Sequence, residues 1–447
     1  MTISIGVFGH VGNGNQGDES VIAATIQNIK RRCPDGVVLG FTLQPRDTES
    51  RHGIRGFPIR RPRRERSTDS SPSPGTVSRW RLRQQSARQH VKRIARVVPL
   101  LYTLLIRLRA VAAGVIALPD ELAFLVRSYR SLKSLHLLIV AGSQQCNDFV
   151  DGPWGLPLTL FKWAILCRLA KTKLAFVSVG AGPLCSRSGR FLVRHALRLA
   201  AYRSFRDRRS RDLVRALGIR GEVHVLPDLV YSLRLPPPSP RASAHPRAGS
   251  RLTIGINPLP LDSPFYWNGY NEAAHARYVS ILAAFAAWLL RGGHAVVLFP
   301  TQLRVDPPVV QEVRLATKRL ADSGTEERLS VPTVESFDAL IATLSTLDLA
   351  VVTRFHGVVL SHLLGTPAIA IAYHEKTQEV MRAVGHADYV IPVQDLNEEW
   401  LARCFSSMSE HLPTSRREIE DATARMRTSL DRQYDRVLAL ARTQRPK

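Results

Sequence analysis

The sequence ISIGVFG, residues 3–9, is followed by HVGNGNQGDE, residues 10–19, and this opening stretch is the strongest indication of the fold. The first seven residues are apolar and rich in β-branched side chains, which predicts a buried strand. The next ten are rich in glycine and asparagine and predict a loop. From Glu19 to Arg32, the residues Val21, Ile22, Ile26 and Ile29 recur at helical spacing. The chain therefore opens with a strand, a glycine-rich loop and a helix.

The same alternation continues along the chain. Leu135–Ala141 and Leu174–Val179 are further buried-strand candidates, each followed by glycine and then by a helical pattern. After the segment PPPSPRASAHPRAG, the alternation restarts with predicted strands at Leu252–Ile256, Ala295–Phe299, Leu349–Thr353 and Ala368–Ala372. Helical patterns lie between and after these strands. This order predicts an α/β protein with two Rossmann-like domains facing a cleft, the GT-B-like architecture.

The breaks in the pattern give the expected domain boundaries. We expect an N-terminal Rossmann-like domain over residues 1–234, with an Arg-rich insertion at about 51–96 that lacks periodicity. A Pro-rich linker covers 235–250, a C-terminal Rossmann-like domain 251–412, and a C-terminal helix 413–447.

The charge balance favours anionic partners. The formal net charge of the 447 residues is +25, and about half of it comes from residues 51–96, which hold fourteen Arg or Lys and only two acids. Nucleic acid, an anionic membrane surface and phosphorylated small substrates all fit such a charge. The five cysteines include no C-x-x-C pair, so we expect neither a disulfide framework nor a structural zinc site. The N-terminus shows no secretory signal pattern, and we expect a cytoplasmic protein.

Polar motifs follow several predicted strands. The glycine-rich loop and the start of the first helix can bind an anion through unpaired backbone N–H groups, or can form an ordinary tight turn capped by Asp18. VVTRFHG, residues 351–357, places Arg354 and His356 at the carboxyl edge of a strand, where open α/β sheets bind ligands. Arg354 suits phosphate or carboxylate, and His356 can donate or accept a proton, although both could instead serve structure. Lys376 follows the next strand and could face the same crevice.

Taken in order, these segments resemble the polysaccharide pyruvyl transferase family over most of the chain. The segments that carry the resemblance are GNQGDE at 14–19, AGS at 141–143, GPWGLP at 152–157, GAGP at 180–183, Arg206 with Asp207 and Ser210, Pro227 with Asp228, and Arg354, Phe355, His356 and Lys376. Phe355 stands where the family usually has an aliphatic residue, and the Arg-rich insertion is atypical.

The resemblance implies transfer of a pyruvyl group from phosphoenolpyruvate to hydroxyls of a cell-envelope sugar, forming a ketal. It implies catalytic roles for His356, Arg354 and Asp18, with His356 as a general acid or base. It also implies substrate contacts from Arg206, Arg354, Lys376, Asn15, Gly17, Glu19 and Gly182. We expect no metal and no cofactor, phosphoenolpyruvate being the donor substrate. The acceptor sugar could be lipid-linked.

Two other functions remain open at this stage. A GT-B glycosyltransferase using a nucleotide sugar would share the fold and the basic crevice. A non-catalytic protein that binds a membrane through the Arg-rich insertion would share the charge, and peripheral attachment to anionic lipid at the inner face is also compatible with an enzyme. We expect no nucleic-acid binding, because the insertion has only Phe57 and Trp80 for base stacking. The acceptor sugar, the ketal stereochemistry and the oligomeric state are not determined by the sequence.

Overall fold

The computed structural model describes residues 3–9, 14–61, 118–149, 151–235, 251–261 and 271–442. The chain divides into two compact units, residues 1–59 with 132–447 and residues 60–131. In the described part of the smaller unit, residues 118–131 are helical and Arg61 donates to Asp120 at 3.1 Å. The fold and the site belong to the larger unit. Residues 10–13, the Arg-rich residues 62–96, the apolar residues 97–117 and the linker residues 236–250 lie outside the described residues.

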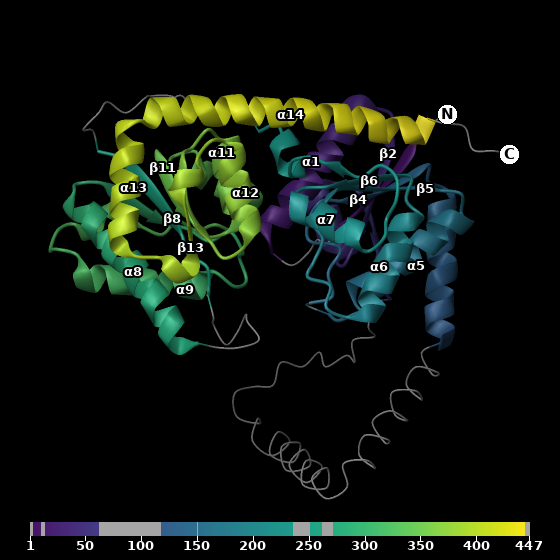
Figure 1. The fold of residues 1–447 in the computed structure, drawn as a ribbon, viewed down its shortest axis with the longest axis horizontal. Coiled ribbons are helices and arrows are strands. Elements are labelled where there is room, and N and C mark those ends of the chain that lie inside the picture. Colours follow the sequence, from purple (N-terminus) through teal and green to yellow (C-terminus); the bar gives the residue numbers. More distant parts are fainter. Residues whose placement is uncertain are drawn as a thin grey trace, which may run out of the picture. The chain divides into compact units, whose positions relative to one another are not determined.

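A first sheet of seven parallel strands has the order β3-β2-β1-β4-β5-β6-β7 (Figure 1). The strands are β1 Ser4–Phe8, β2 Val37–Thr42, β3 Arg55–Pro58, β4 Leu137–Ala141, β5 Lys173–Val179, β6 Tyr202–Phe205 and β7 His224–Val225. The helices of this half are α1 Gln16–Arg32, α2 Pro45–His52, α5 Leu156–Leu169, α6 Arg187–Arg198, α7 Arg208–Ala216 and the 3₁₀ turn η1 Leu229–Ser232. The β1 strand predicted at the opening of the sequence lies inside this sheet.

A second sheet of six parallel strands has the order β10-β9-β8-β11-β12-β13. Its strands are β8 Thr253–Asn257, β9 Ala295–Leu298, β10 Leu329–Ser330, β11 Leu349–Val352, β12 Ala368–Ala372 and β13 Val390–Pro392. Its helices are α8 Glu272–Arg291, α9 Pro307–Leu320, α10 Phe337–Leu344, α11 Phe355–Leu363, α12 Glu375–Ala383 and α13 Glu398–Glu410, with short 3₁₀ turns η3 Glu326–Arg328, η4 Ala387–Tyr389 and η5 Val393–Asp395. The predicted fold class, two Rossmann-like parallel sheets with helices, is confirmed.

Each sheet reverses its strand order at one point, between β1 and β4 in the first and between β8 and β11 in the second. Loops after strands diverge at such switch points and leave room for a ligand at the carboxyl edge. The loops after β1, β4 and β11 carry Asn15, Gln144 and Arg354, which are predicted site residues or direct partners of one.

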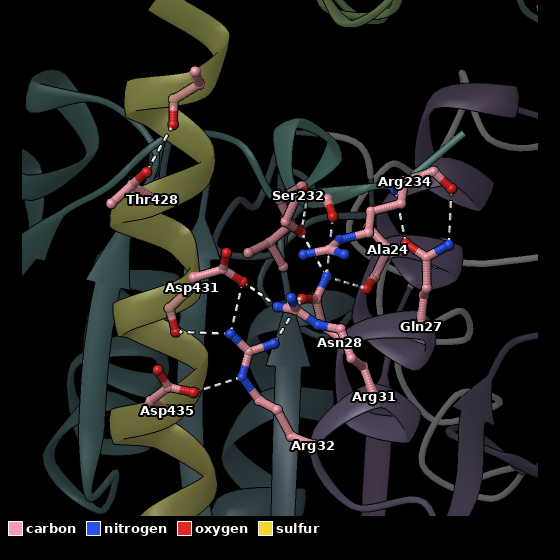
Figure 2. A network of polar contacts seen from close by, with 12 residues as sticks. Ala24, Gln27, Asn28, Arg31, Arg32, Ser232, Arg234, Thr428, Asp431 and Asp435 are labelled. Atoms are coloured by element: carbon pink, nitrogen blue, oxygen red, sulfur yellow. Dashed lines mark hydrogen bonds and ion pairs between the residues drawn. The ribbon is translucent and has the colours of Figure 1, made fainter. Parts of the chain in front are cut away.

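The long helix α14, Leu412–Arg442, packs against α11 and α13 of the second half and against α1, β4 and β5 of the first (Figure 1). Figure 2 shows part of its contact with α1. Arg32 donates to Asp431 at 2.7 Å and to Asp435 at 2.6 Å, and Asn28 donates to Ser232 Oγ at 3.0 Å. These side chains attach the end of the chain to the helix that follows the glycine-rich loop.

The start of the predicted insertion differs from expectation. Residues 55–58 form the edge strand β3, which pairs with β2 in parallel register. The reason is packing, because Phe57 lies 5.5 Å from the ring of Phe41 and 6.0 Å from Trp163, and this aromatic cluster holds the segment on the sheet. The predicted boundary at 235–250 and the other domain limits stay predictions.

Among the described residues, α8 is long and apolar enough to cross a membrane by length and composition. Half of its most apolar stretch is buried, and it packs against β9, α9 and α13. These contacts are those of a core helix covering a sheet.

Candidate functional site

The N-terminal ends of α1 and α11 meet at Gly17 and His356. A Cβ atom built on Gly17 would lie 2.0 Å from His356 Nδ1 and 2.2 Å from its Cγ, so a side chain there would overlap the imidazole. Asn15 caps α1 by accepting a hydrogen bond from the Gly17 amide at 3.1 Å. The glycine of the predicted loop is thus required for the close approach of the histidine rather than for its own backbone angles.

His356 is largely buried, with 14% of its side chain exposed. Its Nε2 atom makes no hydrogen bond within the described part of the chain and lies 3.9 Å from Asp228 Oδ2. Burial lowers the pKa of His356, and the nearby carboxylates of Asp228 and Asp18 oppose this effect. The imidazole can therefore exchange a proton with a ligand through Nε2.

Asp228 is a buried carboxylate at the start of η1. Its Oδ2 accepts from Arg206 Nη1 at 2.9 Å and its Oδ1 from the Val230 amide at 3.1 Å. Burial alone would raise the pKa of Asp228, but Arg206 and His356 outweigh it and hold this pKa below its usual range. Arg206 also donates to Gln144 Oε1 at 2.8 Å, while its buried Nε makes no hydrogen bond to any described residue. Arg206 is thus oriented by two acceptors, and its Nε lies 4.0 Å from Asp207 Oδ2.

Phe355 brings two cations together. The guanidinium carbon of Arg206 lies 4.9 Å from the centroid of its ring, and Lys376 Nζ lies 5.1 Å from the same centroid. Lys376 is partly exposed, and no hydrogen bond or ion pair joins its ammonium group to the described residues. Burial, with repulsion from Arg206, lowers its pKa to about 7. The residue that departs from the family pattern is therefore the one that both cations contact.

Arg354 was predicted to bind an anionic group of the substrate, and in the structure it pairs with a carboxylate of the protein. Its guanidinium, 11% exposed, forms an ion pair with the fully buried Asp306 and donates to it from Nε at 3.2 Å. Asp306 also accepts from the backbone amides of Thr301 at 3.0 Å and Gln302 at 2.7 Å. The ion pair holds the loop that follows β9, and a role for Arg354 as an anion-binding residue stays a prediction.

That loop contacts the start of α1. The Gln16 amide donates to the Thr301 carbonyl at 3.2 Å, and the Leu303 amide donates to the Gly14 carbonyl at 3.0 Å. Two amides at the N-terminus of α1, those of Gln16 and Gly17, are therefore already satisfied, and fewer remain for an anion than the sequence implied.

Three further predicted residues are Asp18, Glu19 and Gly182. Asp18 is partly exposed on the side of His356 and accepts hydrogen bonds from Asn15 at 2.9 Å and from Ser143. Glu19 is 3% exposed and pairs with His52 Nε2 at 3.1 Å, which makes it a structural residue of the first half. Gly182 has φ of +91° and its carbonyl accepts from the Gln144 side chain, so it supports the residue that orients Arg206.

The structure thus gathers Gly17, Asp18, Arg206 and Lys376 around the neighbouring rings of Phe355 and His356. Sequence reasoning left Asp228, Gln144 and Asp306 out of the site. Asp228 follows a proline after a short strand, which was a visible signal, whereas nothing in the sequence distinguishes Gln144 or Asp306 from surface residues. In the described ranges, no group of three or more His, Cys, Asp or Glu is placed to hold a metal ion.

Solved structures of similar fold cover nearly the whole chain. The Anabaena protein HepE in complex with UDP aligns over 99% of this chain and 98% of its own, with 12% identity and a TM-score of 0.54. UDP-GlcNAc 2-epimerase from Neisseria meningitidis bound to UDP-GlcNAc covers 96% and 99%, with 10% identity and a TM-score of 0.52. A glycosyltransferase from Rickettsia africae covers 98% and 99%, with 9% identity and a TM-score of 0.51. At such identities these likenesses show the fold, which is that of GT-B glycosyltransferases.

The sequence itself is more informative about the family. A search of the curated proteins finds no match. The family model described as polysaccharide pyruvyl transferase matches residues 15–375, a range that begins at the cap of α1 and ends one residue before Lys376. The match contains Asp18, Arg206, Asp228 and His356. The chain belongs to the polysaccharide pyruvyl transferase family.

Proposed function

We propose that the chain transfers the pyruvyl group of phosphoenolpyruvate to two hydroxyls of a sugar, forming a ketal and releasing phosphate. The observation that carries the proposal is that Arg206 and Lys376 both contact the ring of Phe355, with the imidazole of His356 beside this ring at the N-terminal end of α11. A substrate that carries both phosphate and carboxylate needs at least two cations. The transfer also needs a group that can exchange a proton.

The reaction balances with a single proton delivered to carbon. Protonation converts the CH₂ group of phosphoenolpyruvate to CH₃ and leaves an oxocarbenium-like centre at C2. One sugar hydroxyl adds to C2 and loses its proton, and a second hydroxyl displaces the phosphate from C2 and loses its proton. Of the two hydroxyl protons, one replaces the proton consumed at carbon and the other leaves on hydrogen phosphate. No oxidant or reductant is required.

The geometry supports a role for each residue. His356 Nε2 carries the proton to or from the reacting atoms. Lys376 and Arg206 bind the anionic groups and stabilise the departing phosphate. Asp18, which Asn15 and Ser143 hold on the side of His356, accepts a proton from an acceptor hydroxyl. We propose no metal and no cofactor in this scheme.

The acceptor is a separate question from the donor. Structural neighbours solved with UDP or UDP-GlcNAc support a nucleotide-linked sugar as one acceptor class, and a lipid-linked sugar is the other. The same neighbours support a second candidate function, glycosyl transfer from a nucleotide sugar. As part of the first proposal, we place the enzyme in the cytoplasm and expect it to bind no nucleic acid.

The deciding experiment measures phosphate release from phosphoenolpyruvate by the full chain, with panels of nucleotide-linked and lipid-linked sugars. We expect acceptor-dependent release that His356→Ala reduces by about 10²- to 10⁴-fold, the usual contribution of a general acid or base. His411→Ala, which changes an exposed histidine on the loop before α14, is the matched control and should leave the rate unchanged. Release of UDP from a UDP-sugar, without phosphate release from phosphoenolpyruvate, would replace the proposal with the glycosyltransferase.

A further inference from the structure

One long segment of the first half contains no acidic residue. Between Gly152 and Arg206 the sequence has ten Lys or Arg and no Asp or Glu. This segment includes α5 and α6, which pack against each other. A surface built from it has an uncompensated positive charge that the proposed chemistry does not use.

The outward side of α6 combines this charge with an exposed aromatic ring. Phe191 is 55% exposed and lies one helical turn from Arg187 and two turns before Arg198, both of which are also exposed. Neither arginine has a hydrogen bond or ion pair with another described residue. The opposite side of α6, including Leu192 and Val193, is buried.

The outward side of α5 continues the same surface. Ile165 is 37% exposed and Leu169 is 62% exposed, at successive turns after Phe161. The ring of His195 on α6 joins the two helices, because its centroid lies 6.3 Å from that of Phe161 and 4.1 Å from that of Phe191. We define this surface as the α5–α6 face, made of Phe161, Ile165, Leu169 and Phe191 with the cations Lys162, Arg168, Arg187 and Arg198.

We propose that the α5–α6 face docks on the surface of an anionic lipid bilayer. Exposed aliphatic and aromatic side chains between arginines suit the boundary of headgroups and acyl chains, where the apolar groups enter and the cations pair with phosphate. Ile165 and Leu169 offer no stacking surface for bases, which disfavours nucleic acid. A second copy would bring two positively charged faces together.

A segment of the same chain is a poor alternative occupant. Residues 62–117 contain twelve Lys or Arg and two acids, so this segment and the α5–α6 face carry charge of the same sign. The proposal goes beyond the catalytic one and does not depend on it. It also places the membrane contact on described residues rather than on the Arg-rich insertion.

The test measures binding of the full chain to phosphatidylcholine vesicles with and without phosphatidylglycerol, by flotation. The apolar variant is Ile165→Ser with Phe191→Ser, and the charge variant is Arg187→Glu with Arg198→Glu. We expect wild-type binding only to the phosphatidylglycerol vesicles, with each variant weakening it about tenfold or more. The control variant, Leu315→Ser with Arg319→Glu, changes the same residue types on α9, where Leu315 is 53% exposed, and should bind as wild type does.

The proposal fails if wild type does not bind these vesicles, or if both face variants bind as tightly as the control. In the second case another segment, such as the Arg-rich insertion, makes the contact. Loss of binding in the charge variant alone also overturns it, because the apolar residues would then not enter the bilayer. Single-stranded RNA binding or self-association that the face variants abolish, without vesicle binding, would assign the face to that partner instead. All variants lie outside the catalytic residues, and cooperative urea unfolding of each variant reports correct folding independently of the proposed activity.

Discussion

Replacing Asp228 by asparagine tests the electrostatic centre of the site. Asp228 and Arg206 have side chains that are 1% and 3% exposed and are joined at 2.9 Å. Asparagine keeps the shape and can still accept from the Val230 amide, but it carries no charge. Arg206 then stays buried without its counter-charge.

The expected cost follows from burial. Removing one partner of a buried ion pair destabilises a protein by about 3–5 kcal/mol, because the other charge stays desolvated. Glu375→Gln provides the matched control. Glu375 pairs with Arg209 at 2.7 Å, and the two side chains are 66% and 70% exposed. Exposed pairs contribute only about 0–1 kcal/mol. The two variants make the same chemical change at sites that differ in burial.

Two assays read the result. Urea unfolding at neutral pH should show the large loss for Asp228→Asn and almost none for Glu375→Gln. Because the folded-state pKa of Asp228 lies below its ordinary value of 3.8, the wild-type advantage is complete above that value and disappears as the pH falls through the folded pKa. In the pH profile of phosphate release, the limb set by His356 should move to lower pH, because Asp228 raises the pKa of His356. Equal stability loss in both variants, together with an unmoved pH limb, would refute this reasoning.

Three further substitutions test other features of the structure. Gly17→Ala should displace the His356 ring, since the added Cβ would lie 2.0 Å from Nδ1. The rate of phosphate release should fall, while the free energy of unfolding in urea changes little. An unchanged rate would mean that the ring is free to move. The pKa of Lys376 is about 7, so the ammonium group loses its charge and the KM for phosphoenolpyruvate should rise as the pH increases through 7. Lys376→Arg should remove this rise because arginine stays charged. A rise that persists in the variant would place the titrating group elsewhere. His362 is buried, shares a hydrogen bond with Tyr231 at 3.1 Å, and has a pKa lowered to about 3 by burial, so the free energy of unfolding should fall as the pH drops below 6.5. His362→Gln should make that fall shallower in urea unfolding. An equally steep fall would exclude His362 as its cause.

The family and the fold class could be predicted from the sequence because the relevant signals are local. The pattern of apolar residues within 3–32 is enough to indicate the strand, the glycine-rich loop and the helix, although β1 pairs with the distant β4 and α1 packs against the distant η1. The strands predicted at the start of the second half, before His356 and before Lys376 are present as β8, β11 and β12. Their carboxyl ends necessarily share an edge in a parallel sheet, which is why His356 and Lys376 could be placed in one crevice.

The strand at residues 55–58, where the Arg-rich insertion was predicted to start, and the ion-pair partners of the charged residues could not be predicted in this way. Phe57 belongs to the sheet because it contacts Trp163, which is more than a hundred residues away. Arg354 stands at a strand end, as predicted, but its partner Asp306 comes from the loop after β9, and the sequence does not show that this buried carboxylate lies beside it.

The sequence alone is enough to predict a two-sheet α/β protein of the pyruvyl transferase family with a histidine and cations at strand ends. The partners of these charged residues are known only from the folded structure. Asp306 pairs with Arg354, and Asp228 with Arg206, while Lys376 lies against Phe355. The physical reason is that the pKa and the availability of a charged group depend on burial and on partners within a few ångströms, and folding brings these together from distant parts of the chain.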